Sequence, residues 1–284
     1  MNSAVASSRS KKVARHSHGQ KRLAYLFFLV ILVAIYLGPI ILLILSSLRS
    51  NNEYATYPIR LFPERIIFWN YLGMLRSREF LDALQRTFLL SITTAIINTF
   101  SSALTGYAFA RLSDVRGSRF LYGIVISMMF VPYIVLLIPQ FIIYARLHLV
   151  NTFWPWYLMA LGGTPLYIFM YRQFFSNFPS ELEEAAEIDG CSHFMTFLYI
   201  ILPNSKPVIS VVLIYAFNAV WSDYIMPTLL LNNPEKLLGT WLAWPSRFMS
   251  YLSAATVLYA LPVIILFLLV QKNIQKGILF TGFK

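Results

Sequence analysis

Hydrophobic residues in this chain form long runs that are separated by short polar segments. Five runs contain no Asp, Glu, Lys or Arg and a sixth contains only Asp223: 23–48, 87–110, 120–145, 147–171, 248–271 and 207–234. A helix needs about 20 apolar residues to cross the hydrocarbon core of a bilayer, whereas strands of a membrane barrel alternate polar and apolar residues over roughly ten positions. The pattern predicts an all-α polytopic membrane protein with six transmembrane helices.

The composition agrees with this interpretation. Hydrophobic residues make up 58% of the 284 residues and charged residues 12%, which is more apolar surface than a soluble domain of this length could bury. The single cysteine, Cys191, excludes an internal disulfide framework. We expect a basic cytoplasmic tail over residues 1–22 and a single transmembrane domain over residues 23–284. The first apolar run is longer than a signal-peptide core, so we expect it to remain as an anchor.

Positive charge is distributed unevenly between the polar segments. Lys and Arg collect on the cytoplasmic side of membrane proteins. With both termini placed inside, the inner segments hold fourteen of the 23 Lys and Arg residues and the outer segments hold nine. We therefore expect a multi-pass protein of the cytoplasmic membrane with both termini in the cytoplasm. The basic tail favours contact with anionic lipid over contact with nucleic acid.

Two features inside the apolar runs predict local geometry. Ser102, Gly106 and Ala110 follow a small-x-x-x-small spacing, which lets two helices approach closely, and we assign them to helix packing. Pro132 and Pro139 lie within the third run, where each removes a backbone hydrogen bond and can open or kink the helix. A break there would either line a cavity or be a packed kink.

Acidic residues are concentrated between the fourth and fifth apolar runs. Five of the twelve acids lie within residues 180–190. Ser180 and Glu183 fit a capping box that starts a helix, and Gly190 can adopt the positive φ that ends one. Ser192 can then cap a second short helix. The segment predicts a helix-turn-helix on the cytoplasmic face, which is either a docking element or a solvated acidic loop.

The residues that follow this acidic start form a pattern over more than twenty positions. Its members are Glu184-Ala185-Ala186, Asp189-Gly190, Leu202-Pro203 and Pro207. They resemble the EAA loop of permease subunits of binding-protein-dependent ABC importers. Further stretches are similar to sugar permeases: Phe68-Trp69-Asn70-Tyr71, Ala108 to Arg111, Val131-Pro132, Ile138-Pro139, Asn151-Thr152, Trp221 to Tyr224 and Lys276-Gly277 to Lys284. The resemblance covers nearly the whole chain and implies the shorter, maltose-type carbohydrate permease of a bacterial type I importer.

The resemblance implies that other proteins complete the transporter. The chain has no G-x-x-x-x-G-K-[ST] phosphate loop, so ATP and Mg²⁺ would be bound by a partner ATPase, and this subunit would have no cofactor, metal or catalytic residue. The implied partners are a second homologous permease, two ATPase subunits, a periplasmic or extracellular solute-binding protein and a carbohydrate. The residues implied to couple this chain to the ATPase are Glu184, Ala185, Ala186, Asp189, Gly190, Leu202 and Pro203.

Polar residues inside the apolar runs are candidates for the translocation pathway or its gate. Asp223 lies about 25 Å along the helix from Lys206, near the outer interface, at about 1.5 Å per residue. A structural or gate-lining role and a ligand contact both remain open for it. Asn218 and Trp221 precede it on the same helix and suit a sugar by hydrogen bonding and stacking, although Trp near an interface is also typical of a membrane belt. Pro132 completes the set.

The cargo and the mode of transport leave alternatives open. The main expectation is ATP-driven uptake of a carbohydrate, and an anionic oligosaccharide such as alginate is one candidate. Five outer arginines suit an anionic cargo and equally suit docking to an acidic binding protein: Arg60, Arg65, Arg76, Arg78 and Arg86. An energy-independent channel or facilitator, an intramembrane enzyme and an ABC permease for a non-sugar solute are the alternatives.

Overall fold

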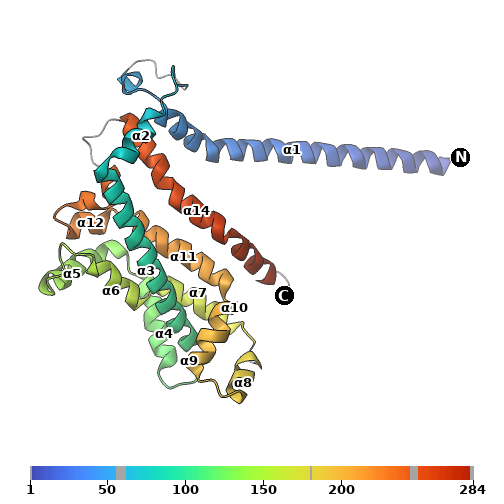
Figure 1. Cartoon of the computed structure of the whole chain (residues 1–284). Helices are drawn as coiled ribbons and strands as arrows, with labels where there is room; N and C mark the ends of the chain where they lie inside the picture. Colours follow the sequence, from blue (N-terminus) through green and yellow to red (C-terminus); the bar gives the residue numbers. More distant parts are fainter. Residues whose placement is uncertain (1, 56–61, 180, 244–248, 282–284) are drawn as a thin grey trace. The chain divides into compact units, whose positions relative to one another are not determined.

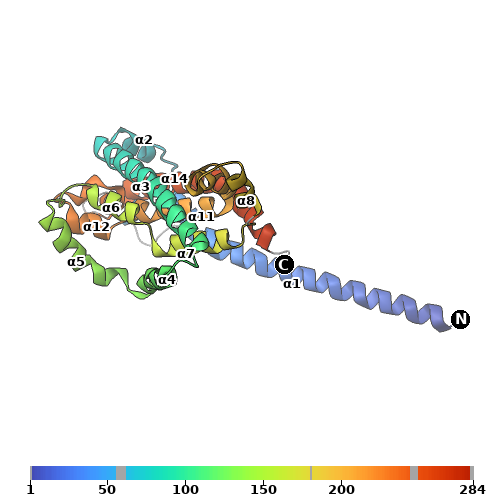
Figure 2. The same ribbon diagram turned by 90° about the horizontal axis from the view of Figure 1, so that it is seen from below.

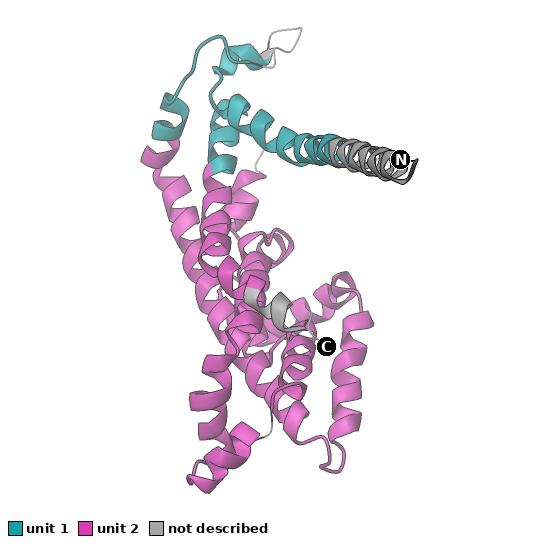
Figure 3. Ribbon diagram, turned by 90° about the vertical axis from the view of Figure 1, so that its right-hand side faces the viewer, with its two compact units in different colours: residues 1–73, 248–257 teal, residues 74–247, 258–284 magenta. Residues whose placement is uncertain are grey.

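The computed structural model describes residues 2–55, 62–179, 181–243 and 249–281. Every regular element within these ranges is helical (Figures 1 and 2), so the prediction of an all-α protein is confirmed. The chain divides into two compact units (Figure 3). The first unit comprises residues 1–73 and 248–257, and the second comprises residues 74–247 and 258–284.

The first unit contains α1 (Asn2–Ser47), the short 3-10 helix η1 (Asn51–Ala55), most of α2 (Trp69–Arg76) and the start of α14 (Met249–Thr281). A buried asparagine closes the turn after α1. The side-chain amide of Asn70 donates to the backbone oxygens of Ser47 and Arg49, both at 2.8 Å. This pairing satisfies carbonyl groups that the end of α1 leaves free.

The second unit is built around the long helix α3 (Arg78–Arg111), which packs against α6, α7 and α11 (Figure 1). Its other elements, in chain order, are α4 (Ser118–Ser127), η2 (Met128–Phe130), α5 (Tyr133–Arg146), α6 (Trp154–Gly162), α7 (Pro165–Ser176), α8 (Glu181–Ile188), α9 (His193–Thr196), the π-helix η3 (Phe197–Ile201), α10 (Leu202–Asn204), α11 (Lys206–Trp221), α12 (Ile225–Leu230), η4 (Pro234–Lys236) and α13 (Leu238–Leu242).

The small-residue spacing on α3 marks the place where α3 meets α7. A Cβ atom added to Gly106 would lie 2.6 Å from the Cβ of Tyr171 and 3.0 Å from both the Arg172 amide nitrogen and the Ile168 carbonyl oxygen. Ser102, one turn earlier, is fully buried. The two backbones therefore touch at Gly106, as the assignment of this spacing to packing predicts.

Prolines and a glycine interrupt two of the predicted helices. The run 120–145 bends by 105° between Phe130 and Tyr133, because Pro132 has no amide hydrogen and holds Val131 in an extended conformation. The run 147–171 is also not one helix. It consists of α6 and α7, which are separated by Gly163 with φ +71° and Thr164 in an extended conformation.

The apolar run 207–234 is also divided, since α11 ends at Trp221 and a separate helix, α12, begins at Ile225. Among the described residues, three helices are long and apolar enough to cross a membrane: Tyr25–Ser47, Arg78–Arg111 and Met249–Gln275. Two bent pairs also qualify if each counts as one span: Ser118–Phe130 with Tyr133–Arg146, and His193–Asn204 with Lys206–Trp221. This gives up to five candidate spans, against six predicted from the charge-free runs.

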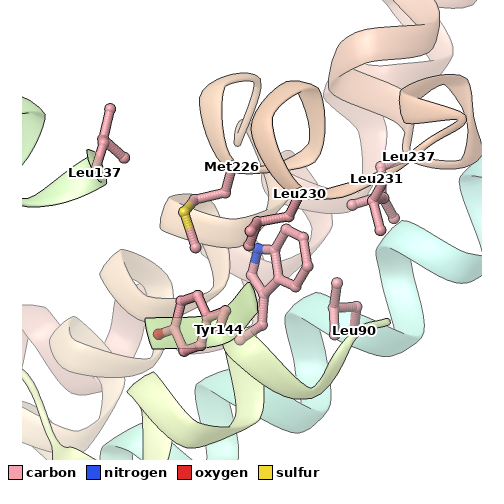
Figure 4. Close-up of a cluster of buried hydrophobic side chains, with 8 residues drawn as sticks. Leu90, Leu137, Tyr144, Met226, Leu230, Leu231 and Leu237 are labelled. Atoms are coloured by element: carbon pink, nitrogen blue, oxygen red, sulfur yellow. The ribbon is translucent and has the colours of Figure 1, made fainter. Parts of the chain in front are cut away.

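A hydrophobic cluster holds the short helix α12 in place. Its buried members come from α3, α5, α6, α12 and the segment after α12 (Figure 4): Leu90, Leu137, Tyr144, Trp156, Met226, Leu230, Leu231 and Leu237. The backbone amide of Asn151 also donates to the Leu230 carbonyl oxygen at 2.7 Å. The loop between α11 and α12, which carries Asp223, is thereby fixed beside α6.

Candidate functional site

The acidic segment folds as a short helix with a defined end. α8 spans Glu181–Ile188, and Gly190 follows it with φ +84°. The Gly190 amide donates to the Glu187 carbonyl oxygen at 3.0 Å and the Cys191 amide to the Ala186 carbonyl oxygen at 2.9 Å. These two hydrogen bonds form a Schellman motif, which requires the positive φ of Gly190. The predicted helix stop is confirmed, whereas the Ser180 half of the predicted capping box lies outside the described residues.

A second helical segment follows at once, as predicted. The Ser192 side chain caps α9 by accepting a hydrogen bond from the Met195 amide at 3.3 Å. The segment continues through η3 and α10 to Asn204 and then bends by 84° into α11. η3 is a π-helix located just before Pro203, where the missing amide hydrogen of proline disturbs the helical hydrogen-bond ladder.

The inner side of α8 is tied to the end of α3 by an ion pair. The Arg111 guanidinium donates to Glu183 Oε1 through Nε at 2.6 Å and also through Nη2. The Tyr107 hydroxyl donates to Glu183 Oε2 at 3.0 Å. Both carboxylate oxygens are thus engaged, and the side chains of Arg111 and Glu183 are only 24% and 12% exposed. We call Arg111, Tyr107 and Glu183 the α3–α8 latch.

Aromatic rings connect this latch to the neighbouring helices. The Phe197 ring of η3 lies 5.2 Å from the Tyr107 ring, 6.1 Å from the Phe100 ring and 6.5 Å from the Phe175 ring. Phe197 and Phe175 are fully buried. A displacement of the segment from α8 to α10 would therefore be transmitted to α3 and α7 through close-packed side chains.

The other predicted coupling residues lie mostly on exposed positions. Glu184, Ala185, Asp189 and Gly190 are exposed, and so is Pro203. Leu202 is half-buried and Ala186 is buried. Two large apolar side chains of α8, Leu182 and Ile188, are 45% and 87% exposed. α8 therefore has one face attached to α3 and another that presents acidic and apolar groups outward.

A cavity of about 740 Å³ lies inside the second unit. α3, α5, α6, α7, α11 and α12 contribute to its lining, together with the interruptions at Val131 and at Gly163–Thr164. Asp223 is at its edge, where Oδ2 accepts a hydrogen bond from Trp156 Nε1 at 2.9 Å and Oδ1 accepts one from the Met226 amide at 3.1 Å. The carboxylate thus ties α6 to the start of α12.

The remaining predicted pathway residues occupy different environments. Trp221 is fully buried, with its ring stacked between Phe217 at 5.3 Å and Tyr259 at 5.4 Å, and it does not line the cavity. Asn218 is exposed and also lies outside the lining. Pro132 stands between two lining residues, Val131 and Tyr133. Of the predicted set, the structure brings only Asp223 to the cavity wall.

Replacement of Trp221 by phenylalanine tests its role as a packing residue. The change keeps the stacked arrangement but removes the hydrogen bond from Trp221 Nε1 to the Tyr259 carbonyl oxygen, which is 3.2 Å long. We expect a loss of about 1–3 kcal/mol of stability from the lost hydrogen bond and the smaller buried ring, seen as a lower unfolding midpoint of the detergent-solubilised protein, with substrate uptake unchanged. A large rise in the KM for cargo at normal stability would place Trp221 in the pathway instead.

The class of this membrane protein follows from its sequence relatives. Residues 102–279 match the family model described as the binding-protein-dependent transport system inner membrane component, and the chain belongs to this family. It is 28% identical to the arabinooligosaccharides transport system permease protein AraQ of Bacillus subtilis, over 93% of this chain and 96% of AraQ. It is also 28% identical to the maltodextrin transport system permease protein MalD of Streptococcus pneumoniae, over 92% of this chain and 95% of MalD.

A solved structure has the same fold. A chain from the crystal structure of a bacterial ABC transporter involved in the import of the acidic polysaccharide alginate superposes with a TM-score of 0.73. The two chains are 21% identical, and the match covers 90% of this chain and 97% of the other. Resemblance to the ABC importer permease family, expected from the EAA-like residues, is thereby confirmed.

Proposed function

We propose that this chain is the permease subunit of an ABC importer that moves a carbohydrate, in the simplest case an oligosaccharide, into the cytoplasm with ATP hydrolysed by a partner. Two relatives that match nearly the whole chain are named for arabinooligosaccharides and maltodextrin, which supports this cargo class. The complete transporter would contain a second permease, two ATPase subunits and an external solute-binding protein.

The arrangement in the membrane follows from the apolar segments. The three long helices and two bent pairs supply up to five spans. α6 and α7 together cover the predicted run 147–171 and would supply the sixth, crossing as two half-helices. Broken helices cross membranes where neighbouring protein satisfies the freed backbone groups, and here the Thr164 amide donates to Ser102 Oγ at 3.1 Å. Six spans would place both termini on the same side, and the excess of Lys and Arg in the segments on that side favours the cytoplasm.

The two-sided character of α8 is the observation that carries the proposal. Its attached face is held by the α3–α8 latch, while its outward face carries Glu184 and Ile188, and Leu182 lies at the edge between the two faces. Ile188, which is 87% exposed next to acidic side chains, supplies apolar surface that a partner could bury favourably. We assign this outward face to the ATPase. Closure of the ATPase dimer would displace α8, and the latch would pass that displacement to α3.

This coupling is a shift between two arrangements of the helices. A partner can change such an equilibrium only by binding one arrangement more tightly than the other. The latch supplies the connection that makes the affinity of the ATPase depend on the position of α3. Glu184 and the turn at Gly190 determine whether the ATPase can bind α8.

Substitutions in the outward face and its turn test the proposal. Glu184→Lys reverses an exposed charge, and Gly190→Pro removes both the φ of +84° and the amide donor of the Schellman motif. We expect each to reduce ATP-dependent uptake in proteoliposomes by about tenfold or more, which corresponds to about 1.4 kcal/mol of lost coupling. Co-purification of the ATPase should fall in parallel.

Asp114→Lys is the matched control, because Asp114 is 94% exposed and pairs only weakly, at 3.7 Å, with Arg119. It makes the same change of charge in a neighbouring polar segment and should leave uptake unchanged. If Glu184→Lys and Gly190→Pro both bind the ATPase and transport normally, α8 is not the coupling element.

A further inference from the structure

The segment that joins α1 to α2 exposes several large apolar side chains within a few positions. These are Phe62, Ile66, Phe68 and Trp69, and each is between 58% and 72% exposed. The segment and α1 both belong to the first unit (Figure 3). The coupling to an ATPase proposed above uses none of these side chains, so their exposure needs a separate explanation.

Hydrogen bonds hold this segment at the end of the membrane span of α1. The candidate span is Tyr25–Ser47, and its most apolar stretch buries no side chain inside the described protein. The Ile67 amide donates to the Leu48 carbonyl oxygen at 2.9 Å, and the hydroxyl groups of Tyr71 and Ser47 form a hydrogen bond of 2.5 Å. Because these partners stand where the apolar helix ends, the segment lies at the boundary between the hydrocarbon core and the headgroups.

The segment has an inner and an outer side. Ile67, which bonds to the end of α1, is half-buried, and Asn70, which donates to two carbonyl groups there, is buried. Ile66 and Phe68 flank Ile67 and are exposed. The attached residues therefore face the protein, while their neighbours point away from it, at the end of the apolar surface that α1 presents to its surroundings.

The chemistry of the outer side suits lipid. Aromatic side chains are enriched at the two membrane interfaces, and apolar groups held at that level bury about 5–10 Å into the boundary between headgroups and acyl chains. A water-soluble partner approaches from beyond the headgroups, so side chains held at the end of a span are more accessible to lipid. The charged residues of segment 62–69 are Glu64 and Arg65, whose charges cancel. The attraction is therefore apolar and requires no anionic lipid.

We propose that Phe62, Ile66, Phe68 and Trp69 form an interfacial anchor that inserts into the lipid leaflet at the Ser47 end of α1. In the arrangement proposed above, this is the outer leaflet. The anchor fixes the depth of α1, because the hydrogen bonds at Ser47 and Leu48 connect the two. The inference goes beyond the proposed function, since it requires that α1 crosses a bilayer and does not require transport.

Quenching of a fluorescent label tests the anchor in the full chain, reconstituted in phosphatidylcholine vesicles. Cys191 is the single cysteine, so Cys191→Ser permits one bimane label at Phe68→Cys. We expect phosphatidylcholine that is brominated near the headgroup end of its acyl chains to quench this label strongly, and aqueous iodide to quench it weakly. Asn52→Cys is the control, because Asn52 is an exposed polar residue of η1 in the same unit. Its label should be quenched by iodide.

Two results would overturn the proposal. Equal quenching by iodide at Phe68→Cys and Asn52→Cys would place the segment in water, where a soluble partner could cover it. Protection of the Phe68→Cys label from both quenchers would mean that protein covers the segment, either a second copy of this chain or another part of it.

A second label tests whether the anchor sets the depth of α1. Ile44→Cys, at an exposed position near the end of α1, reports depth as the ratio of quenching by deep and by shallow bromines. The span of about 35 Å, at about 1.5 Å per residue, is longer than a hydrocarbon core of about 30 Å. Without the anchor, α1 can tilt and draw its end inward, so Phe62→Ser with Phe68→Ser should raise the ratio by about twofold.

Phe120→Ser with Phe130→Ser is the matched control for this change. Both rings are exposed, at 73% and 82%, and lie in the second unit, outside the anchor. The ratio should stay at the wild-type value. An equal ratio in both double variants would overturn the role of the anchor in setting the depth of α1. If the anchor variant fails to insert, the label at Phe68→Cys in the otherwise unchanged segment still decides whether lipid covers it.

Discussion

If the proposed function holds, replacement of Arg111 by alanine is expected to reduce ATP-dependent uptake by about tenfold or more, while the proposed partner ATPase continues to hydrolyse ATP. The Arg111 and Glu183 side chains are mostly buried, at 24% and 12% exposure. Breaking one side of a buried ion pair costs about 3–5 kcal/mol, because the remaining charge stays buried without its partner. Since Arg111 keeps some contact with water, the lower end of that range is the better guide. A loss of this size frees α8 from α3, so a movement of the ATPase no longer reaches the membrane helices.

The measurement is the ratio of sugar taken up to ATP hydrolysed, which separates loss of coupling from loss of protein. Glu183→Ala should lower this ratio to the same extent as Arg111→Ala. The double exchange of Arg111→Glu with Glu183→Arg should restore part of the wild-type ratio. Arg119→Ala is the matched control, because its pair with Asp114 is fully exposed at 84% and 94%, and exposed pairs contribute about 0–1 kcal/mol. If the single changes lower uptake and hydrolysis together, and the exchange restores neither, the latch does not transmit the motion.

This latch could not have been derived from the sequence. Arg111 and Glu183 are 72 positions apart, and no local pattern pairs a basic residue at the end of one apolar run with one glutamate among five acids. What the sequence did provide was local geometry. The Gly190 turn and the Ser192 cap depend only on backbone requirements of neighbouring residues, and both were predicted correctly.

Charge-free runs located apolar segments but not the helices within them. The run 147–171 contains Gly163 and Pro165, and these two residues end α6 and start α7. Counting charges ignores both signals, so a single helix was predicted where two occur. Pro132 was recognised, and the bend of 105° that follows it has the expected cause.

Residue type alone was a poor guide to the cavity. Trp221 and Asn218 suit a sugar chemically, yet the direction in which each side chain points depends on how α11 packs. Trp221 points toward Phe217 and Tyr259 in the core, while Ala219 and Val220 of the same helix line the cavity. Gln140 lines the cavity and gave no signal in the sequence, because its place there depends on how α5 packs.

Resemblance to a family supplied residues whose physical role only the structure explains. Asn70 was part of a sugar-permease-like stretch, and its amide proves to close the turn after α1. Asn151 was part of another. It adopts φ +64°, which asparagine tolerates better than most residues. Its backbone amide donates a hydrogen bond to the Leu230 carbonyl oxygen at the end of α12. Both residues therefore stabilise turns, and neither is a lining residue of the cavity.

Replacement of Gly106 by alanine is expected to have the second large effect. This change lowers the stability of the folded protein and does not act on coupling to the ATPase. The nearest atoms to an added methyl group would be the Tyr171 Cβ at 2.6 Å and two backbone atoms of α7 at 3.0 Å. None of these can rotate away, so α3 and α7 must separate. Overpacking of this kind costs about 1–3 kcal/mol, and Gly106→Ala is expected to fall at the upper end, because the separation also loosens the Phe175 and Phe197 contacts that surround Tyr107.

Gly123→Ala provides the comparison, since Gly123 also lies within a helix, α4, and has no atom within 4 Å of an added methyl group. In thermal unfolding of the detergent-solubilised protein, Gly106→Ala should lower the midpoint by several degrees, while Gly123→Ala should leave it unchanged or raise it, because alanine favours the helix by about 1 kcal/mol over glycine. Gly106→Leu should prevent accumulation of the folded protein in the membrane. Equal midpoints for the two alanine variants would mean that α3 and α7 can separate without cost, and the close approach would then not be what holds the second unit together.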